Sequence, residues 1–158
     1  MQQYTFKTSK INTRPVIRVY ENLTAVIDTG ADIPVCSNAD VLVERFRAQE
    51  IILPNKGIEA VGIGGSVKGR IFRVKGFELG PLTYPELNFF VPNEPTMSTI
   101  FLLSASMFTG LICEVNFKDH YFKITLPDDE QTVRLVSFEK DGEHICWDIR
   151  KSDNMESM

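Results

Sequence analysis

The sequence predicts a single all-β domain, barrel-like and closed, with one or two short helices. Short segments rich in branched and aromatic residues recur along most of the 158-residue chain, separated by Gly, Pro, Asn or Asp turn signals. The length suits one domain, and a hydrophobic fraction of 43% provides an ordinary core without metals or disulfides. Few segments have helical spacing, so strands are expected to dominate the architecture.

The N-terminal half is predicted to begin with hairpin-connected strands. Residues 4–8 alternate between apolar and polar side chains, and residues 16–20 and 23–27 are apolar runs separated by a turn signal. Residues 38–47 are the best helix candidate, because Asn38 can act as an N-cap and apolar residues then recur at helical spacing.

The second half of the chain is again predicted to be strand and turn. The strand candidates are residues 58–63, 66–77, 87–91, 99–103, 111–117 and 121–126. Gly64 and Gly65 predict a tight turn in the first hairpin, and residues 104–108 are expected to form one or two helical turns. We therefore expect a main domain over residues 1–126.

Residues 127–158 are interpreted as a C-terminal extension. It begins with an acidic stretch and contains two further strand candidates, residues 132–136 and 145–149. We hypothesise that the extension either completes a dimer interface or restrains a binding groove. Its last residues are expected to fray.

Composition argues against several classes of partner. A net charge of −4 without a strong basic cluster disfavours nucleic acid. No apolar run approaches the roughly 20 residues that span a bilayer, and the N-terminus lacks the apolar segment of a signal peptide. We therefore expect a cytoplasmic protein, or a fragment released from a longer precursor, with no membrane partner. The three cysteines have long spacings that match no metal site or disulfide framework, so no metal or cofactor is expected.

The candidate chemistry centres on Asp28, Thr29 and Gly30. The carboxylate of Asp28 follows an apolar strand directly and is therefore delivered to the end of that strand. Gly30 allows a sharp turn without a Cβ in the way, and the Thr29 hydroxyl can tie the loop down by hydrogen bonds. Taken alone, this tripeptide is more typical of an ordinary acidic turn after a strand than of a catalytic loop.

Three blocks together resemble the retroviral aspartic proteases (retropepsins) in their order and spacing. Residues 25–32 are similar to the active-site loop, residues 61–68 to the glycine-rich tip of the flap, and residues 101–108 to the apolar pair and short helix behind the loop. The resemblance runs from about residue 14 to about residue 126. It implies the acid-protease fold with one lobe per chain.

The resemblance also implies roles for individual residues. Asp28, Thr29 and Gly30 would form the catalytic loop of an aspartic endopeptidase. Substrate contacts carry over to Val26, Ala31, Asp32, Val35, Gly62, Ile63, Gly64 and Leu102. The pocket positions among them are apolar, so bulky apolar residues are expected around the scissile bond of a peptide or protein substrate.

A single Asp-Thr-Gly copy implies a homodimer. Peptide hydrolysis by this route needs two carboxyl groups that share a proton and activate one water by general acid/base catalysis. This chain is too short for two lobes, so a twofold axis would bring Asp28 and its mate together. Two flaps, with Ile63 near each tip, would then close over an extended peptide.

Two departures from the family pattern leave an alternative open. Ser104 stands where the family usually has glycine, and Ala105 where retroviral enzymes usually have an arginine that supports the dimer. The alternative is a non-catalytic peptide-binding or dimerisation module that keeps the retropepsin fold; an unrelated structural β-barrel is a further reading. His120 and His144 are isolated in the sequence, which favours solvated or core histidines over catalytic bases.

Overall fold

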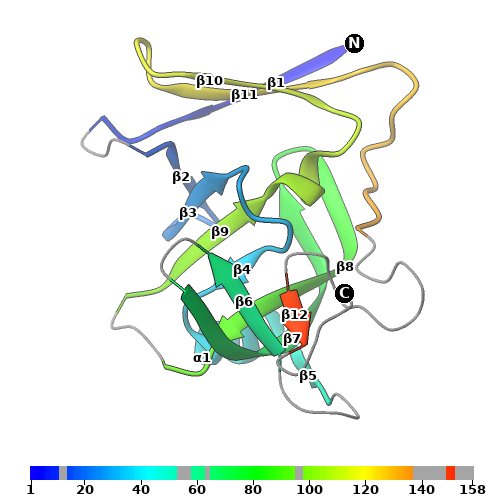
Figure 1. Ribbon diagram of the computed structural model, residues 1–158. Helices are drawn as coiled ribbons and strands as arrows, with labels where there is room; N and C mark the ends of the chain where they lie inside the picture. Colours follow the sequence, from blue (N-terminus) through cyan, green and yellow to red (C-terminus); the bar gives the residue numbers. More distant parts are fainter. Residues whose placement is uncertain (11–13, 53–57, 63–64, 95–97, 137–148, 152–158) are drawn as a thin grey trace.

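The computed structural model describes residues 1–10, 14–52, 58–62, 65–94, 98–136 and 149–151, and within them the chain is mostly β-strand (Figure 1). The strands are β1 (Gln2–Lys7), β2 (Val16–Val19), β3 (Leu23–Asp28), β4 (Val35–Cys36), β5 (Gln49–Ile51), β6 (Ile58–Gly62), β7 (Gly65–Leu79), β8 (Leu82–Pro92), β9 (Ile100–Ser104), β10 (Ile112–Asn116), β11 (Tyr121–Leu126) and β12 (Ile149–Lys151). The helical elements are α1 (Ala39–Phe46) and the 3-10 helix η1 (Ala105–Phe108). The expected all-β class is confirmed.

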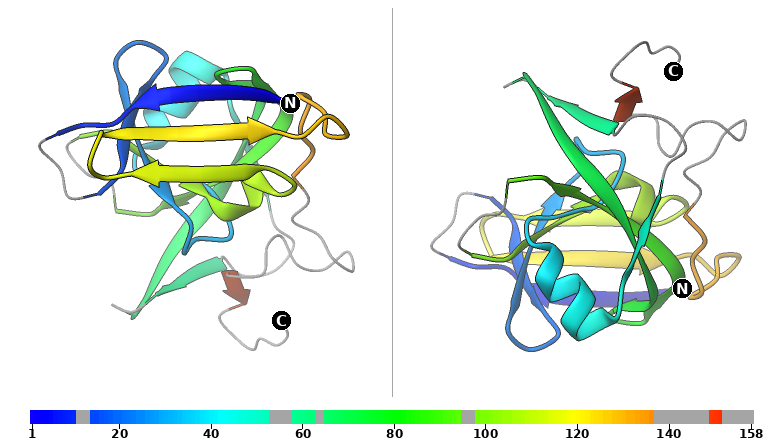
Figure 2. Two further views of the ribbon diagram at one scale, coloured as in Figure 1. Left: turned by 90° about the horizontal axis from the view of Figure 1, so that it is seen from above. Right: turned by 90° about the horizontal axis from the view of Figure 1, so that it is seen from below.

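The strands form two sheets. A three-stranded antiparallel sheet has the order β1-β11-β10, and a nine-stranded sheet has the order β12-β6-β7-β8-β4-β9-β3-β2, with β5 paired to β7. The smaller sheet lies across one end of the molecule, at the top of Figure 1 and facing the viewer in the left view of Figure 2.

The expectation of a closed barrel is wrong for the described residues. Strands β12 and β2 stand at opposite ends of the larger sheet and do not pair with each other. The three strands that could have extended it, β1, β10 and β11, pair among themselves, which satisfies their backbone hydrogen bonds in a separate sheet.

The core lies where the two sheets pack together with α1. Its centre is a group of fully buried rings: Phe77 and Phe89 have centroids 5.4 Å apart, and Phe89 and Phe101 have centroids 5.5 Å apart. The smaller sheet contributes Phe122 and Ile124, which alternate along β11 with more polar neighbours. Each buried ring contributes about 2 kcal/mol by removal of its apolar surface from water.

The predicted helix is confirmed, with its cap. The Asn38 side chain accepts a hydrogen bond from the backbone N–H of Asp40 at 2.9 Å, which satisfies one of the free donors of the first turn. Leu42 is the fully buried residue of α1. Arg47 ends the helix in the left-handed conformation (φ 53°).

The C-terminal extension packs against the main domain where it is described. Residues 132–136, expected to be a strand, make only an isolated parallel bridge between Val133 and Thr83 of β8. Most of the second expected strand, residues 145–148, lies outside the described residues. Its last residue begins β12, which pairs antiparallel with β6 through Ile149 and Ala60.

Candidate active site

Asp28 is the last residue of β3 and opens a tight loop. β3 lies between β2, to which it is antiparallel, and β9, to which it is parallel, and the register places Asp28 beside Ser104. The Asp28 Oδ1 accepts the N–H of Gly30 at 3.2 Å, and the N–H of Ala31 donates to the Asp28 carbonyl at 3.2 Å. The half-buried carboxylate is therefore held by its own loop, residues 28–32, called here the Asp28 loop.

The start of η1 holds the Asp28 loop from behind. The N–H of Ala105 donates to the Ala31 carbonyl at 3.0 Å, and the hydroxyl of Ser106 donates to the Asp32 carbonyl at 2.5 Å. The hydroxyls of Ser104 and Ser106 lie 2.7 Å apart, and Ser104 is fully buried. The sequence reasoning missed Ser106, because a serine in a short helical segment carries no signal for a contact with a loop more than seventy residues earlier.

Thr29 and Gly30 form the exposed tip of the Asp28 loop. Among the residues that the structure describes, a Cβ at Gly30 would approach only Asp28 Oδ1, at an ordinary 3.5 Å, so these residues give no steric reason for glycine there.

Three of the predicted contact residues lie side by side on adjacent strands. Val26 of β3 is in register with Leu102 of β9, and Leu102 is in register with Val35 of β4. Because side chains two residues apart share a face of a strand, Val26 lies on the same face as Asp28. Val26 is buried, whereas Leu102 and Val35 are partly exposed, so they form an apolar surface next to the carboxylate. Ala31 and Asp32, within the loop, are partly exposed.

The predicted glycine-rich turn belongs to the β6–β7 hairpin. Gly62 pairs with Gly65 at its end, while Ile63 and Gly64 lie outside the described residues. The hairpin extends away from the rest of the fold in both views of Figure 2. Gly69 is buried at the base of the hairpin, and a Cβ there would collide with the Val91 carbonyl and the Phe90 ring.

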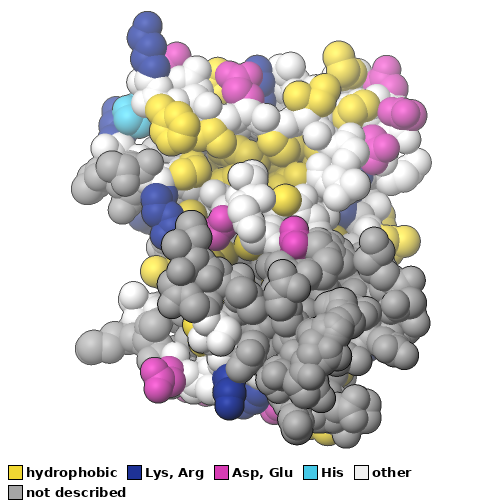
Figure 3. Space-filling model, in the orientation of Figure 1, with side chains coloured by type: hydrophobic (Ala, Val, Ile, Leu, Met, Phe, Trp, Pro, Cys, Tyr) yellow, Lys and Arg dark blue, Asp and Glu magenta, His cyan; other side chains and the backbone are white. Residues whose placement is uncertain are grey.

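Apolar side chains gather on the face drawn in Figure 3, in the region of the three-stranded sheet and directly below it. Acidic side chains lie at the lower margin of this region. Exposed residues of the smaller sheet and its turns include Ile112, which is 59% exposed, and Phe117, which is 65% exposed. Single exposed apolar side chains are normal on a protein surface, so these two residues do not by themselves define a binding site.

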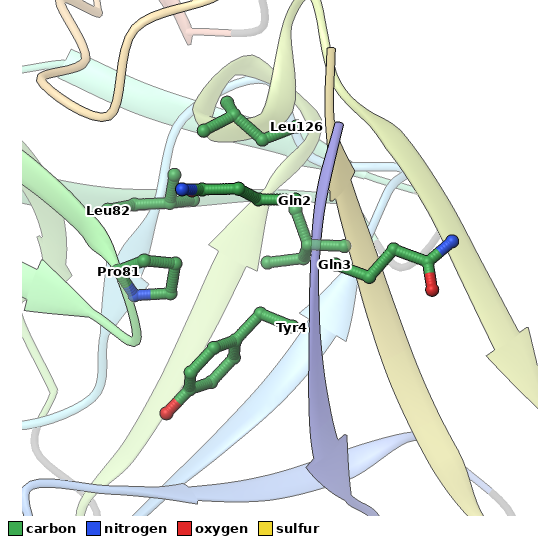
Figure 4. A pocket seen from close by; sticks show the side chains of 7 residues that line it. Gln2, Gln3, Tyr4, Pro81, Leu82 and Leu126 are labelled. Carbon is green, nitrogen blue, oxygen red and sulfur yellow. The ribbon is translucent and has the colours of Figure 1, made fainter. Parts of the chain in front are cut away.

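A separate pocket of about 290 Å³ lies between β1 and the β7–β8 turn (Figure 4). Its lining residues are Gln2, Gln3, Tyr4, Pro81, Leu82, Ile124 and Leu126. They include no titratable acid or base other than the tyrosine, and none of them belongs to the Asp28 loop. This pocket therefore offers no chemistry comparable to that of Asp28.

Other candidate chemistries find no site in the described part of the chain. There, no three His, Cys, Asp or Glu side chains come together as metal ligands. Burial raises the pKa of the Cys36 thiol to about 11, and the thiol donates to the Asn38 carbonyl at 3.3 Å, which makes it an unreactive core residue. No helix of the described residues combines the length and apolar character needed to span a membrane.

The chain was compared with protein-family models, curated proteins and solved structures, and none of the three comparisons returned a match.

Proposed function

We propose that the protein is an aspartic endopeptidase of the retropepsin type that works as a homodimer. The observation that carries the proposal is the setting of Asp28: a half-buried carboxylate at the end of β3, in a tight loop that η1 holds from behind. The Asp28-Thr29-Gly30 sequence and the glycine-rich hairpin further along the chain add the resemblance to that family.

The proposed chemistry needs one Asp28 from each of two chains. Two carboxyl groups about 3 Å apart share a single proton, because a second negative charge at that distance is costly. The ionised carboxylate takes a proton from the attacking water, while the protonated one donates to the oxygen of the scissile carbonyl. The roles reverse when the amine leaves, so the apparent pKa values belong to the pair.

The geometry of a single chain is compatible with such a pair. Thr29 and Gly30 are exposed at the tip of the Asp28 loop, where a second copy of the loop would approach across a twofold axis. Gly30 has no crowded neighbour among the described residues of its own chain, so the close approach of a partner loop would supply a reason for glycine. The exposed Thr29 hydroxyl would hydrogen-bond across the axis.

The proposed substrate is an extended peptide with apolar residues around the scissile bond. It would lie between the β6–β7 hairpin and the partly exposed surface of Val35 and Leu102, its backbone hydrogen-bonding as an added strand. The hairpin extends from the fold and would close over the peptide as a flap, which excludes water from the reaction. The net charge of −4 and the absence of basic clusters fit a peptide better than a nucleic acid.

The test is cleavage of a peptide library by the wild-type protein and by Asp28→Asn. We expect cleavage at apolar pairs by the wild type and loss of at least about 10³-fold in the variant, as for other removals of an essential acid/base pair. Asp40→Asn is the matched control, because Asp40 is an exposed aspartate on α1. Cleavage that survives Asp28→Asn would refute the proposed mechanism.

The alternative is a peptide-binding module without activity. Ser104 favours this alternative, because it stands where the family usually has glycine and is buried and hydrogen-bonded to Ser106. An intact dimer that binds apolar peptides tightly but leaves them uncut from acid to neutral pH would support this alternative.

A further inference from the structure

One charged side chain is buried within the described residues, and it belongs to the C-terminal extension. Arg134 is 8% exposed, whereas the other buried polar residues of the described chain, Asn88, Ser104 and Thr125, are uncharged. Burial of a guanidinium is costly unless hydrogen bonds and a counter-charge replace the lost water. The contacts of the Arg134 side chain therefore indicate which part of the fold the C-terminal extension stabilises.

The guanidinium of Arg134 joins the extension to the end of η1. Its Nη1 donates to Glu130 Oε1 at 3.0 Å and to the Gln131 carbonyl at 3.1 Å, both within the extension. Its Nη2 donates to the carbonyl of Thr109, the residue that directly follows η1. A single planar group thus links the extension to the C-terminal end of the short helix.

Glu130 fits closely against the same turn. Gly110, next to Thr109, has a φ of 86°, and a Cβ there would lie 2.5 Å from Glu130 Oε1. The turn after η1 is therefore shaped to receive the Arg134–Glu130 ion pair. Any side chain at position 110 would be strained in its backbone and would press on the glutamate.

The backbone of the extension is fixed to β8 at the same place. The N–H of Thr83 donates to the Thr132 carbonyl at 2.9 Å, and the N–H of Arg134 donates to the Thr83 carbonyl at 2.7 Å. These bonds set the position from which the Arg134 side chain reaches η1. Tyr84, the next residue of β8, donates its buried hydroxyl to the Met107 carbonyl at 2.8 Å, so β8 also grips the helix directly.

The opposite end of η1 supports the Asp28 loop. Ala105 and Ser106, at its start, donate to the carbonyls of Ala31 and Asp32. The helix is only four residues long, and the Thr109 hydroxyl donates back to the Ser106 carbonyl at 3.3 Å. A shift of Thr109 is therefore transmitted over a single turn to the residues that hold the loop.

We propose that Arg134 is a positioning residue for the Asp28 loop, acting through η1. The proposal rests on the proposed function in that the loop is taken to carry the catalytic carboxylate. The described part of the C-terminal extension, residues 127–136, then serves to fix the short helix that sets the loop. A misplacement of a reacting group by about 1 Å can cost about 10²-fold in rate, so a residue that fixes the position of the Asp28 loop through η1 affects turnover.

The test compares Arg134→Met and Arg134→Lys with Arg73→Met. Arg73 is the matched control, since it is an arginine whose contacts, with Glu86 at 3.9 Å and Asn88, lie on β8 and not on η1. We expect Arg134→Met to lower kcat by about tenfold or more with a small change in KM. Arg134→Lys should have a kcat between those of Arg134→Met and Arg73→Met, because lysine keeps the positive charge but not the planar fork of donors.

Amide hydrogen exchange provides the readout that does not depend on catalysis. In Arg134→Met we expect faster exchange of the Ala31 and Ala105 amides, with the amides of β7 and of residues 87–91 in β8 unchanged, since these lie away from the bonds between Thr83 and the extension. Uniformly faster exchange in all strands, or unchanged exchange at both residues, would overturn the positioning role, as would a variant with wild-type kcat. A wild-type protein that cleaves nothing would sink the proposed function alone, because the exchange experiment still decides how the loop is held.

Discussion

Replacement of Ser106 by alanine tests how η1 holds the Asp28 loop. A hydroxyl has one proton, and that of Ser106 points to the Asp32 carbonyl at 2.5 Å. The hydrogen bond of 2.7 Å between the two serines must then be donated by Ser104 to Ser106. Ser106→Ala therefore removes a donor and an acceptor together.

The expected loss of stability follows from which serine donates each hydrogen bond. Loss of the bond to the Asp32 carbonyl contributes about 1 kcal/mol, and the hydroxyl of fully buried Ser104 loses the acceptor it has in this structure, which adds about 1–2 kcal/mol. The total is about 2–3 kcal/mol of unfolding free energy. Ser104→Ala removes only one donor and leaves the bond to Asp32 intact, so about 1 kcal/mol or less is expected.

Urea unfolding measures these losses of unfolding free energy, in the wild type, both single variants and the double variant. In the double variant the stranded hydroxyl is gone, so we expect it to be no less stable than Ser106→Ala alone. If Ser104→Ala proves to be as costly as Ser106→Ala, the assigned direction of the hydrogen bonds is wrong, and η1 does not hold the loop through Ser106 as described.

Three further predictions concern other parts of the fold. Gly69→Ala should cost about 1–3 kcal/mol of unfolding free energy, because a Cβ there collides with the Val91 carbonyl. The hydrogen bond from Tyr121 lowers the pKa of Glu114 from its ordinary 4.5. The stabilisation from this carboxylate is therefore present above pH 4.5 and is lost as the pH falls through the folded-state pKa. Glu114→Gln should abolish this part of the acid sensitivity, measured by urea unfolding at a series of pH values. Cys36 is fully buried, and this burial raises the pKa of its thiol to about 11, so its alkylation, followed by mass spectrometry, should be slow at pH 8.

Each of these has its own contradicting result. Gly69→Ala within about 0.5 kcal/mol of the wild type would mean that β7 and β8 do not approach so closely. If the stability of Glu114→Gln depends on acid pH in the same way as that of the wild type, the pKa of Glu114 is not lowered in the folded state. Glu44→Gln, at an exposed position of α1, is the control for the loss of one surface charge. Alkylation of Cys36 as fast as that of a free thiol at pH 8 would show that the thiol is not shielded.

The local elements were predictable from the sequence because their signals are local. Asn38 and the periodic apolar residues after it predicted α1, and short apolar runs between turn signals predicted strands such as β10 and β11. The two-residue strand β4 is too short for any periodicity. The partition into two open sheets depends on pairings such as Gln2 with Leu126, and no local pattern encodes a partner so distant in sequence.

The candidate site divides in the same way. Asp28 was singled out because its motif follows a strand directly, and the structure places Val26, Leu102 and Val35 side by side, while their role as a contact surface stays a prediction. The supports were not predictable. Ser106 and Arg134 act across long separations on backbone carbonyls, and a carbonyl acceptor leaves no trace in the sequence of the loop that offers it.

The central claim is that Asp28 of one chain works with Asp28 of a second chain. Mixing wild-type and Asp28→Asn chains at constant total concentration, after subunits have exchanged, tests it most directly. If both carboxyl groups are required, activity follows the square of the wild-type fraction and falls to about one quarter in an equal mixture. Activity proportional to the wild-type fraction, about one half in the same mixture, would mean that each chain acts alone and would contradict the account.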